Sequence, residues 1–460
     1  MVALASASLS LEAGADTAAL WDGATANWTD APHWSTNPLF PNNGGGTFFD
    51  AFISGGVATV NQNILINQLV QSGGTLTGSS TLAVAEGIAW SGGTVALTGA
   101  GRVTLGGGSA SSVSGSPIFT SGRIVGGGGA SFSISAGATL TVVDQASFFA
   151  DAASPVWTLN NAGTFVSRST SGAGFTSMDA AFNNSGAALV ELAGGTGQTL
   201  SLAGGGTHSG TFTLASGTAL EFGNNTTLQN GASFTGAGVA YVAGDVVVAG
   251  SASGTNLTIA VGELLLGGSL LNVTGTAAQT GGTLRMTGGT FRIAGGAGTL
   301  LMDDGMLRGS GTIDGSLEAQ GIIDPSGTLS VTGVTAFGAD GRLSLGIGGT
   351  AAGSFDRLTS GSATLAGTLE IRLSDGFTPA EGDSFTIVTA PAGVSGFFDN
   401  APIDGMRVGT ADGQGSFAVD YTGTSVVLTQ FIPEPSSALL STLTGACLAG
   451  RRRRKVTRRP

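Results

Sequence analysis

The chain has 460 residues, of which 81 are glycine and only 10% are charged. Its hydrophobic fraction of 41% is enough to bury a core, so the composition excludes a disordered chain, and the lack of a Gly-X-Y period excludes collagen. Seven of the 17 Lys and Arg lie in the last ten residues, so residues 1–450 hold ten cations against 29 acids, a net charge of −19. A body this acidic repels nucleic acid, whose binding depends on phosphate neutralisation, and we expect no nucleic-acid partner.

The first 18 residues allow two interpretations. Residues 1–18 are rich in small side chains and contain an Ala-x-Ala pattern of the kind found at signal-peptide cleavage sites. They lack the basic start and the apolar run of a complete signal, so a truncated signal and the absence of a signal both stay open. The one cysteine, Cys447, excludes a disulfide within the chain and any metal cluster built on several cysteines.

Residues 19–54 stand apart because they hold three of the five tryptophans. Trp21, Trp28 and Trp34 occur among prolines, in a segment with few repeats. Repetitive β structures need a terminal unit that shields the last open coil, and bulky aromatic side chains suit that task. We therefore expect an N-terminal cap here. The alternative is that the three rings stack on sugars.

Residues 55–335 repeat one pattern. Short stretches alternate apolar and polar residues and end at glycine pairs, as in "SGGTLTGSSTLAVAEGIAWSGGTV". Alternation with a period of two predicts strands with one buried face, and glycine supplies the positive φ of tight turns. Gly-Gly-Thr recurs at Gly73 and Gly92, a spacing of nineteen residues that matches one coil of a parallel β-helix. We predict an all-β fold, an irregular right-handed parallel β-helix or solenoid; the competing fold is a β-sandwich.

Residues 336–430 change in character. They have longer alternating stretches, fewer glycine pairs and acidic turns such as "SDG" and "EGD". This pattern predicts a small antiparallel β module that covers the second end of the coil stack.

Residues 431–460 carry the most specific pattern in the chain. Pro433, Glu434 and Pro435 form a rigid, extended segment, because each proline fixes its own φ and keeps the residue before it out of the α region. Residues 436–450 contain no charge. Four arginines follow directly: Arg451, Arg452, Arg453 and Arg454. An uncharged run followed by cations predicts a short transmembrane helix with a stop-transfer end, which leaves the preceding residues outside the cytoplasm.

The order of these parts resembles the PEP-CTERM sorting signal of Gram-negative bacteria. The resemblance implies that Pro433, Glu434 and Pro435 are the sorting motif and that residues 436–450 hold the chain in the inner membrane. It also implies a transient partner, exosortase, a membrane cysteine protease-transpeptidase that removes the tail and passes the protein to the outer surface, often in bacteria that make exopolysaccharide. The "WDG" opening, the Gly-Thr-Leu strands and "LAGTLEIRL" resemble surface proteins with autotransporter-associated β-strand repeats.

Residues suited to catalysis are few. The two histidines, His33 and His208, stand in unrelated contexts, and neither predicts a Ser-His-Asp triad. Pairs of carboxylates that suit glycoside hydrolysis also fit ordinary turns: Asp303 with Asp304, and Asp314 with Asp324. The stretch "GGGGASFS" lacks the acid of a calcium-binding β-helix repeat, and no lysine follows a glycine run as in a phosphate loop. We expect no cofactor, no metal site and no catalytic residue.

Two functions stay open. The first is a non-enzymatic structural protein of the cell surface or the extracellular matrix, held briefly in the inner membrane and then displayed or released. The second is a carbohydrate-binding or polysaccharide-degrading β-helix with the same sorting tail. Exopolysaccharide is a further expected partner, and the ligand of the body stays open.

Overall fold

The structure, a computed structural model, describes residues 16–150, 157–170, 172–194 and 197–434. Those residues form 44 strands and two short 3-10 helices, η1 (Ala31–His33) and η2 (Ala294–Gly296), and they contain no α-helix. The chain divides into two compact units. Unit 1 comprises residues 1–265 and 269–275, and unit 2 comprises residues 266–268 and 276–460. Among the described residues, no helix has the length and apolar character needed to cross a membrane.

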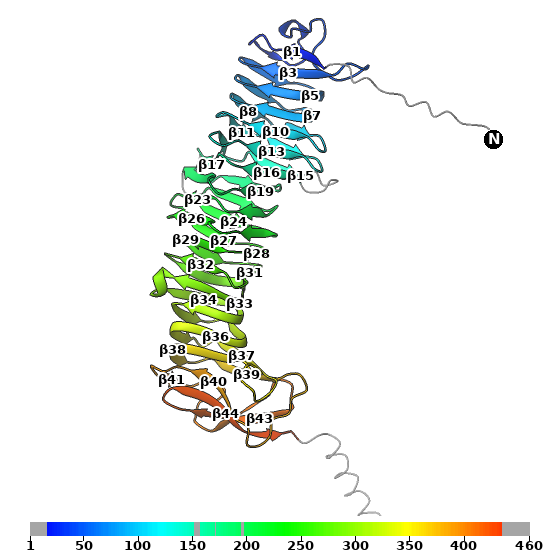
Figure 1. The fold of residues 1–460 in the computed structure, drawn as a ribbon. Coiled ribbons are helices and arrows are strands. Elements are labelled where there is room, and N and C mark those ends of the chain that lie inside the picture. Colours follow the sequence, from blue (N-terminus) through cyan, green and yellow to red (C-terminus); the bar gives the residue numbers. More distant parts are fainter. Residues whose placement is uncertain (1–15, 151–156, 171, 195–196, 435–460) are drawn as a thin grey trace, which may run out of the picture. The chain divides into compact units, whose positions relative to one another are not determined.

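Unit 1 is a parallel β-solenoid, as the alternating pattern predicts, and not a sandwich (Figure 1). Each regular coil contributes one strand to each of three sheets, so a strand pairs in parallel with the third strand after it. The first sheet contains β1 (Thr17–Leu20), β3 (Phe49–Ile53), β5 (Ile64–Gln71), β7 (Thr81–Trp90), β10 (Ala110–Val113), β13 (Ser131–Ile134), β16 (Thr158–Asn161), β19 (Ala181–Asn184), β22 (Gly206–His208), β25 (Thr226–Leu228) and β28 (Val246–Val248).

The other two sheets of unit 1 are built in the same way. The second contains β2 (Thr25–Asn27), β4 (Val57–Val60), β6 (Thr75–Gly78), β8 (Thr94–Leu97), β11 (Ile118–Ser121), β14 (Thr139–Val143), β17 (Thr164–Ser169), β20 (Leu189–Gly194), β23 (Thr211–Leu214), β26 (Ser233–Gly236), β29 (Ser251–Gly254) and β32 (Leu270–Val273). The third contains β9 (Arg102–Leu105), β12 (Arg123–Gly126), β15 (Ser147–Ala150), β18 (Phe175–Ser177), β21 (Thr199–Leu202), β24 (Ala219–Phe222), β27 (Val239–Val242) and β30 (Leu257–Ile259). Strand β31 spans Glu263–Leu266.

Unit 2 begins with long strands and ends with an antiparallel group. Its parallel strands are β33 (Ala277–Ile293), β34 (Thr299–Asp314), β35 (Ser316–Ala319), β36 (Ile322–Phe337), β37 (Arg342–Ile347), β38 (Arg357–Leu365) and β39 (Thr368–Leu373). They are followed by β40 (Phe385–Thr389), β41 (Val394–Gly396), β42 (Met406–Gly409), β43 (Gly415–Tyr421) and β44 (Ser425–Pro433). Strand β44 pairs antiparallel with both β40 and β43, and β42 pairs antiparallel with β43.

The register of the parallel pairs explains both the repeat and its drift. Thr75 pairs with Thr94, nineteen residues later, which is the spacing of the Gly-Gly-Thr motifs just before them. Other coils differ in length: Thr158 pairs with Ala181, and Ala219 pairs with Val239. Loops of different length between strands of constant register thus make a solenoid whose sequence shows no fixed period.

The core consists of inward side chains that stack from coil to coil. In the second sheet, Phe212 is the register partner of Phe234, and Phe234 is followed by Gly254 on the next strand. Both phenylalanines are buried, and the ring centroid of Phe234 lies 6.1 Å from that of Phe222. Burying rings of this size supplies most of the hydrophobic stabilisation that strands of three or four residues need.

The N-terminal residues close the first coil with tryptophans. Trp21, Trp28 and Trp34 are all buried, and the ring centroids of Trp28 and Trp34 are 4.8 Å apart. The Nε1 atom of Trp28 donates to the carbonyl of Pro41 at 2.8 Å, and that of Trp34 donates to the carbonyl of Trp28 at 2.7 Å. These rings are packed inside the protein, so their faces are not offered to a sugar.

Gly254 tests the stacking model directly. An added Cβ at this position would overlap the ring of Phe234, so we expect Gly254→Ala to lower the free energy of unfolding of unit 1 by about 1–3 kcal/mol, the usual cost of overpacking. Gly186→Ala is the control, because an added Cβ there meets no atom within 4 Å and the backbone does not need a positive φ. All five tryptophans lie in unit 1, so urea unfolding followed by tryptophan fluorescence reports on it. Equal midpoints for the two variants would contradict the packing described.

Candidate functional site

The predicted sorting motif begins at the end of the last described strand. Pro433 is the final residue of β44 and pairs with Gly415 of β43, and the backbone N–H of Glu434 donates to the carbonyl of Gln414 at 3.0 Å. Pro433 therefore lies in an extended strand, as its sequence predicts. Pro435, the uncharged residues 436–450 and the arginines Arg451–Arg454 lie outside the described residues, so their predicted roles stay predictions.

The residues just before the motif are firmly held. Phe431 is buried, and its ring centroid lies 4.8 Å from that of Phe417. A Cβ added at Gly415 on β43 would overlap the Phe431 ring. Arg407 also holds this segment in place. Its guanidinium donates to the carbonyl of Gln430 at 2.8 Å and to the hydroxyl of Ser416 on the neighbouring strand. The three residues after Phe431 are exposed. The motif thus starts where the packed part of unit 2 ends.

The two histidines lie in different surroundings and do not form a catalytic group. His33 Nδ1 lies 2.9 Å from Asp22 Oδ2, and both side chains are substantially exposed. This hydrogen bond with His33 holds the pKa of the Asp22 carboxyl below its usual range. His208 is instead fully buried at the end of β22, among Phe182, Phe212 and Phe222.

Three of the four carboxylates considered for glycoside hydrolysis accept hydrogen bonds within the protein. Asp314 accepts from Arg292 Nε at 2.7 Å, which holds the pKa of its carboxyl below the usual value. Asp324 accepts from Arg372 Nη2 at 2.6 Å. Asp304, which lies within β34, accepts from the backbone N–H of Gly305 at 2.7 Å. A glycosidase needs two carboxylates free to act on one bond, and ion-paired carboxylates do not meet that need.

Sequence reasoning missed one carboxylate with an unusual environment. Asp356 accepts backbone hydrogen bonds from Gly327 and Gly346, both at 2.7 Å. Burial outweighs these bonds and raises the pKa of its carboxyl. It ties two neighbouring coils of unit 2 together. In the described residues, no three side chains among His, Cys, Asp and Glu are placed to hold a metal ion.

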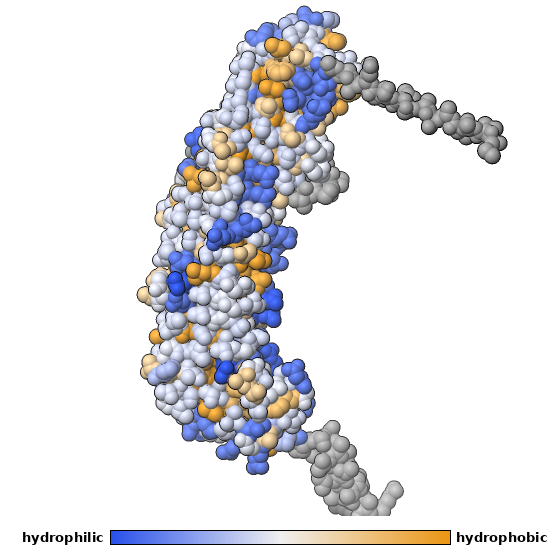
Figure 2. All heavy atoms as spheres, in the orientation of Figure 1, coloured by the Kyte–Doolittle hydropathy of each residue, from blue (hydrophilic) through white to orange (hydrophobic). Residues whose placement is uncertain are grey.

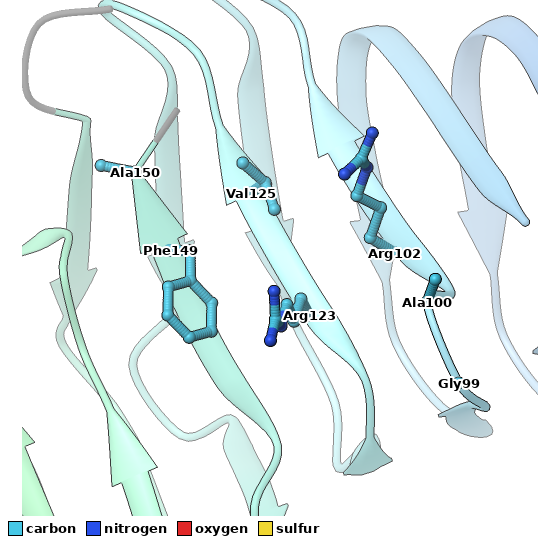
Figure 3. A pocket seen from close by; sticks show the side chains of 7 residues that line it. All are labelled: Gly99, Ala100, Arg102, Arg123, Val125, Phe149 and Ala150. Atoms are coloured by element: carbon cyan, nitrogen blue, oxygen red, sulfur yellow. The ribbon is translucent and has the colours of Figure 1, made fainter. Parts of the chain in front are cut away.

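Two adjoining hollows on unit 1 form the second candidate site, which the sequence did not indicate. The first has a volume of about 530 Å³ and is lined by Arg102, Arg123 and Phe149, among others (Figure 3). The second, of about 850 Å³, shares Arg123 and Phe149 and extends to Phe175. These side chains come from β9, β12, β15 and β18, four successive strands of the third sheet. Only the coil register brings together residues that are spread over more than 70 positions.

No family model matches this chain, and neither a curated protein nor a solved structure matches it. The two candidate sites are therefore supported by their own residues and geometry, and not by similarity to a known protein.

Buried His208 predicts how stability depends on pH. Burial lowers the pKa of its imidazole to about 3, and neither ring nitrogen has a hydrogen-bond partner among the described residues. Unfolding releases a group with an ordinary pKa near 6.5, so the unfolded chain binds the extra proton and stability falls as the pH drops below about 6.5. From pH 7 to pH 5 this group should cost unit 1 about 2 kcal/mol.

The measurement is urea unfolding of unit 1 at pH 7 and pH 5, followed by tryptophan fluorescence. We expect His208→Leu to remove most of this pH dependence, because leucine carries no titrating group and Leu228 occupies the same position on the next strand. An unchanged loss of stability between the two pH values in the variant would show that other groups cause it.

Proposed function

We propose that this chain is an exported structural protein of a bacterial cell surface or extracellular matrix, and that it is a substrate of exosortase. The observation that carries the proposal is the order of Pro433–Glu434–Pro435, the uncharged residues 436–450 and the arginine run Arg451–Arg454. In this proposal residues 436–450 hold the chain in the inner membrane as a transmembrane segment, and the arginines keep its end on the cytoplasmic side. Exosortase then cuts near the motif, and the body is displayed on the cell surface or released.

The position of the motif supports this assignment. A protease binds its substrate in an extended form. Ile432 and Pro433 lie in the extended strand β44, and these two residues and Glu434 are exposed just beyond the buried side chain of Phe431. The backbone hydrogen bond from Glu434 to Gln414 is the last one before Pro435. An enzyme at the membrane needs to peel only this short end from β43 to reach the motif. The body can stay folded during processing.

The surface of the body suits a structural role. Outward positions of the strands hold mainly Thr, Ser, Ala and Gly, and Figure 2 shows a face of mostly intermediate hydropathy with scattered apolar and charged residues. We also propose that the coils are right-handed, as nearly all parallel crossovers are, and that the body is related to autotransporter-associated β-strand repeats. The stacked Gly-Thr-Leu strands support the second point.

One observation favours the alternative, a carbohydrate-binding β-helix with the same tail. The hollows at Arg102, Arg123 and Phe149 combine cations with aromatic rings on an exposed sheet face. A polysaccharide-degrading activity has less support, because Asp314 and Asp324 pair with arginines and Asp304 accepts from the backbone N–H of Gly305.

The sorting proposal is tested by replacing Pro433, Glu434 and Pro435 with alanine. We expect the body to stay folded and the uncleaved chain to remain in the inner membrane. The matched control replaces two exposed prolines and one exposed glutamate of the same unit, Pro391, Pro402 and Glu381, and should be sorted normally.

Intact-mass measurement of the surface or released protein gives the result. The unaltered chain and the control should lack residues beyond about 435. Recovery of external protein that still contains Arg451–Arg454, or normal release of the triple-alanine chain, would contradict the proposal.

A further inference from the structure

Two arginines stand side by side on neighbouring coils of unit 1, and among the described residues neither forms an ion pair. Arg102 and Arg123 are register partners between β9 and β12, and neighbouring strands lie about 4.8 Å apart. Thr81 precedes them in this column and Ser147 follows them, so no acid alternates with the two cations. Both side chains are exposed. Like charges opposite each other on adjacent strands destabilise a sheet, so this arrangement favours an anion placed against it.

Several other arginines of the body have an acidic side chain beside them. In unit 2, Arg292 pairs with Asp314, its register partner, and Arg342 pairs with Glu370 at 3.0 Å. A second stacked pair, Arg285 and Arg308, continues in register to Asp324 on the next strand. The solenoid thus supplies an acid beside its arginines in several places. It supplies none in the column of Arg102 and Arg123.

Aromatic rings lie directly beside this pair. The Arg123 guanidinium carbon sits 4.8 Å from the centroid of the Phe149 ring, a cation–π contact, and Figure 3 shows the two side chains next to each other on adjacent strands. The adjoining hollow leads to Phe175, whose side chain is 48% exposed. The two cations and the two rings therefore lie on four successive strands of one sheet, with Phe149 and Phe175 displaced by two residues to opposite sides of the arginine column.

We propose that these hollows bind an acidic polysaccharide, with Arg102 and Arg123 holding uronate carboxylates and Phe149 and Phe175 contacting sugar rings. A guanidinium offers a planar fork that matches a carboxylate, and the cation–π contact orients that of Arg123. An aromatic face packs against the apolar face of a sugar ring. A polymer with one carboxylate per ring also avoids the charge density of duplex DNA, one per about 1.7 Å, which a body of net charge −19 repels.

The residues that line the two hollows suit binding of a ligand more than catalysis. Among the described residues that line the two hollows, Asp144 is the one acid, and its carboxylate accepts hydrogen bonds from Ser169 Oγ at 3.1 Å and Thr170 Oγ1 at 2.7 Å. The same described lining contains no histidine, lysine or tyrosine. The inference deepens the carbohydrate-binding alternative and is independent of the sorting proposal, because it concerns the folded body alone.

The test is calorimetric titration of the full-length chain with trigalacturonate at about 0.15 M salt, with maltotriose as the neutral probe. We expect trigalacturonate to bind and maltotriose to bind far more weakly. Replacing both arginines, Arg102→Gln with Arg123→Gln, should weaken trigalacturonate binding at least about tenfold, since each charge-assisted pair is worth that much. Phe149→Leu should weaken it about threefold.

A matched control separates this site from general charge effects. Arg285→Gln with Arg308→Gln removes the same two charges from another stacked pair and should leave the affinity unchanged. This control also accounts for the basic residues 451–459, which every variant keeps. The charge-conserving change Arg102→Lys with Arg123→Lys should give an intermediate affinity, because the charge remains and the fork is lost. Near-UV circular dichroism checks that each variant is folded.

Three results would overturn the inference. They are no binding of trigalacturonate by the unaltered chain, equal weakening by the two arginine-to-glutamine variants, and equally tight binding of a short oligothymidylate at the same site. The last would identify a general polyanion site. None of these outcomes bears on whether the tail is cut, which the intact-mass measurement decides separately.

Discussion

In-register stacking of one coil on the next is the constraint on which this protein depends. Strands of three or four residues cannot bury a core alone, and they gain stability only when each pairs in parallel with the strands above and below it. Where the register is kept, each residue meets the residue at the same position of the next coil. Inward positions then form columns such as Phe212 and Phe234, and outward positions form columns of hydroxyls or charges.

The register also determines which partner each charged side chain on the outer face can reach. Within a column an arginine can meet an acid, as Arg292 meets Asp314, or another arginine, as Arg102 meets Arg123. The first case is a structural ion pair that ties two coils together. The second leaves a cationic surface in an acidic protein, where an external anion can bind. Carboxylates therefore serve mainly as links between coils, and Asp356 does so through backbone N–H groups.

Much of the fold follows from short-range sequence patterns, and the candidate site of unit 1 does not. Alternation and glycine turns indicate the strands, and the nineteen-residue spacing of Gly73 and Gly92 reproduces a true coil register. The Gly-Gly-Thr motifs that begin at Gly281 and Gly288 are only seven residues apart, because both lie inside one long strand, β33, and not on successive coils. Coil length varies along the chain, so the sequence alone could not place Arg102 beside Arg123, or His208 in an aromatic core.

The most direct test of this account is a disulfide between register partners on the outer face. Thr213→Cys with Thr235→Cys, in a chain with Cys447→Ser, places two cysteines on adjacent strands about 4.8 Å apart, within the range that a disulfide spans. Thr213→Cys with Ser253→Cys places them two strands apart, beyond that range. Mass spectrometry after mild oxidation should find the link in the first chain and not in the second. Failure of the first pair to link, or equal linking of both, would contradict the stacked register.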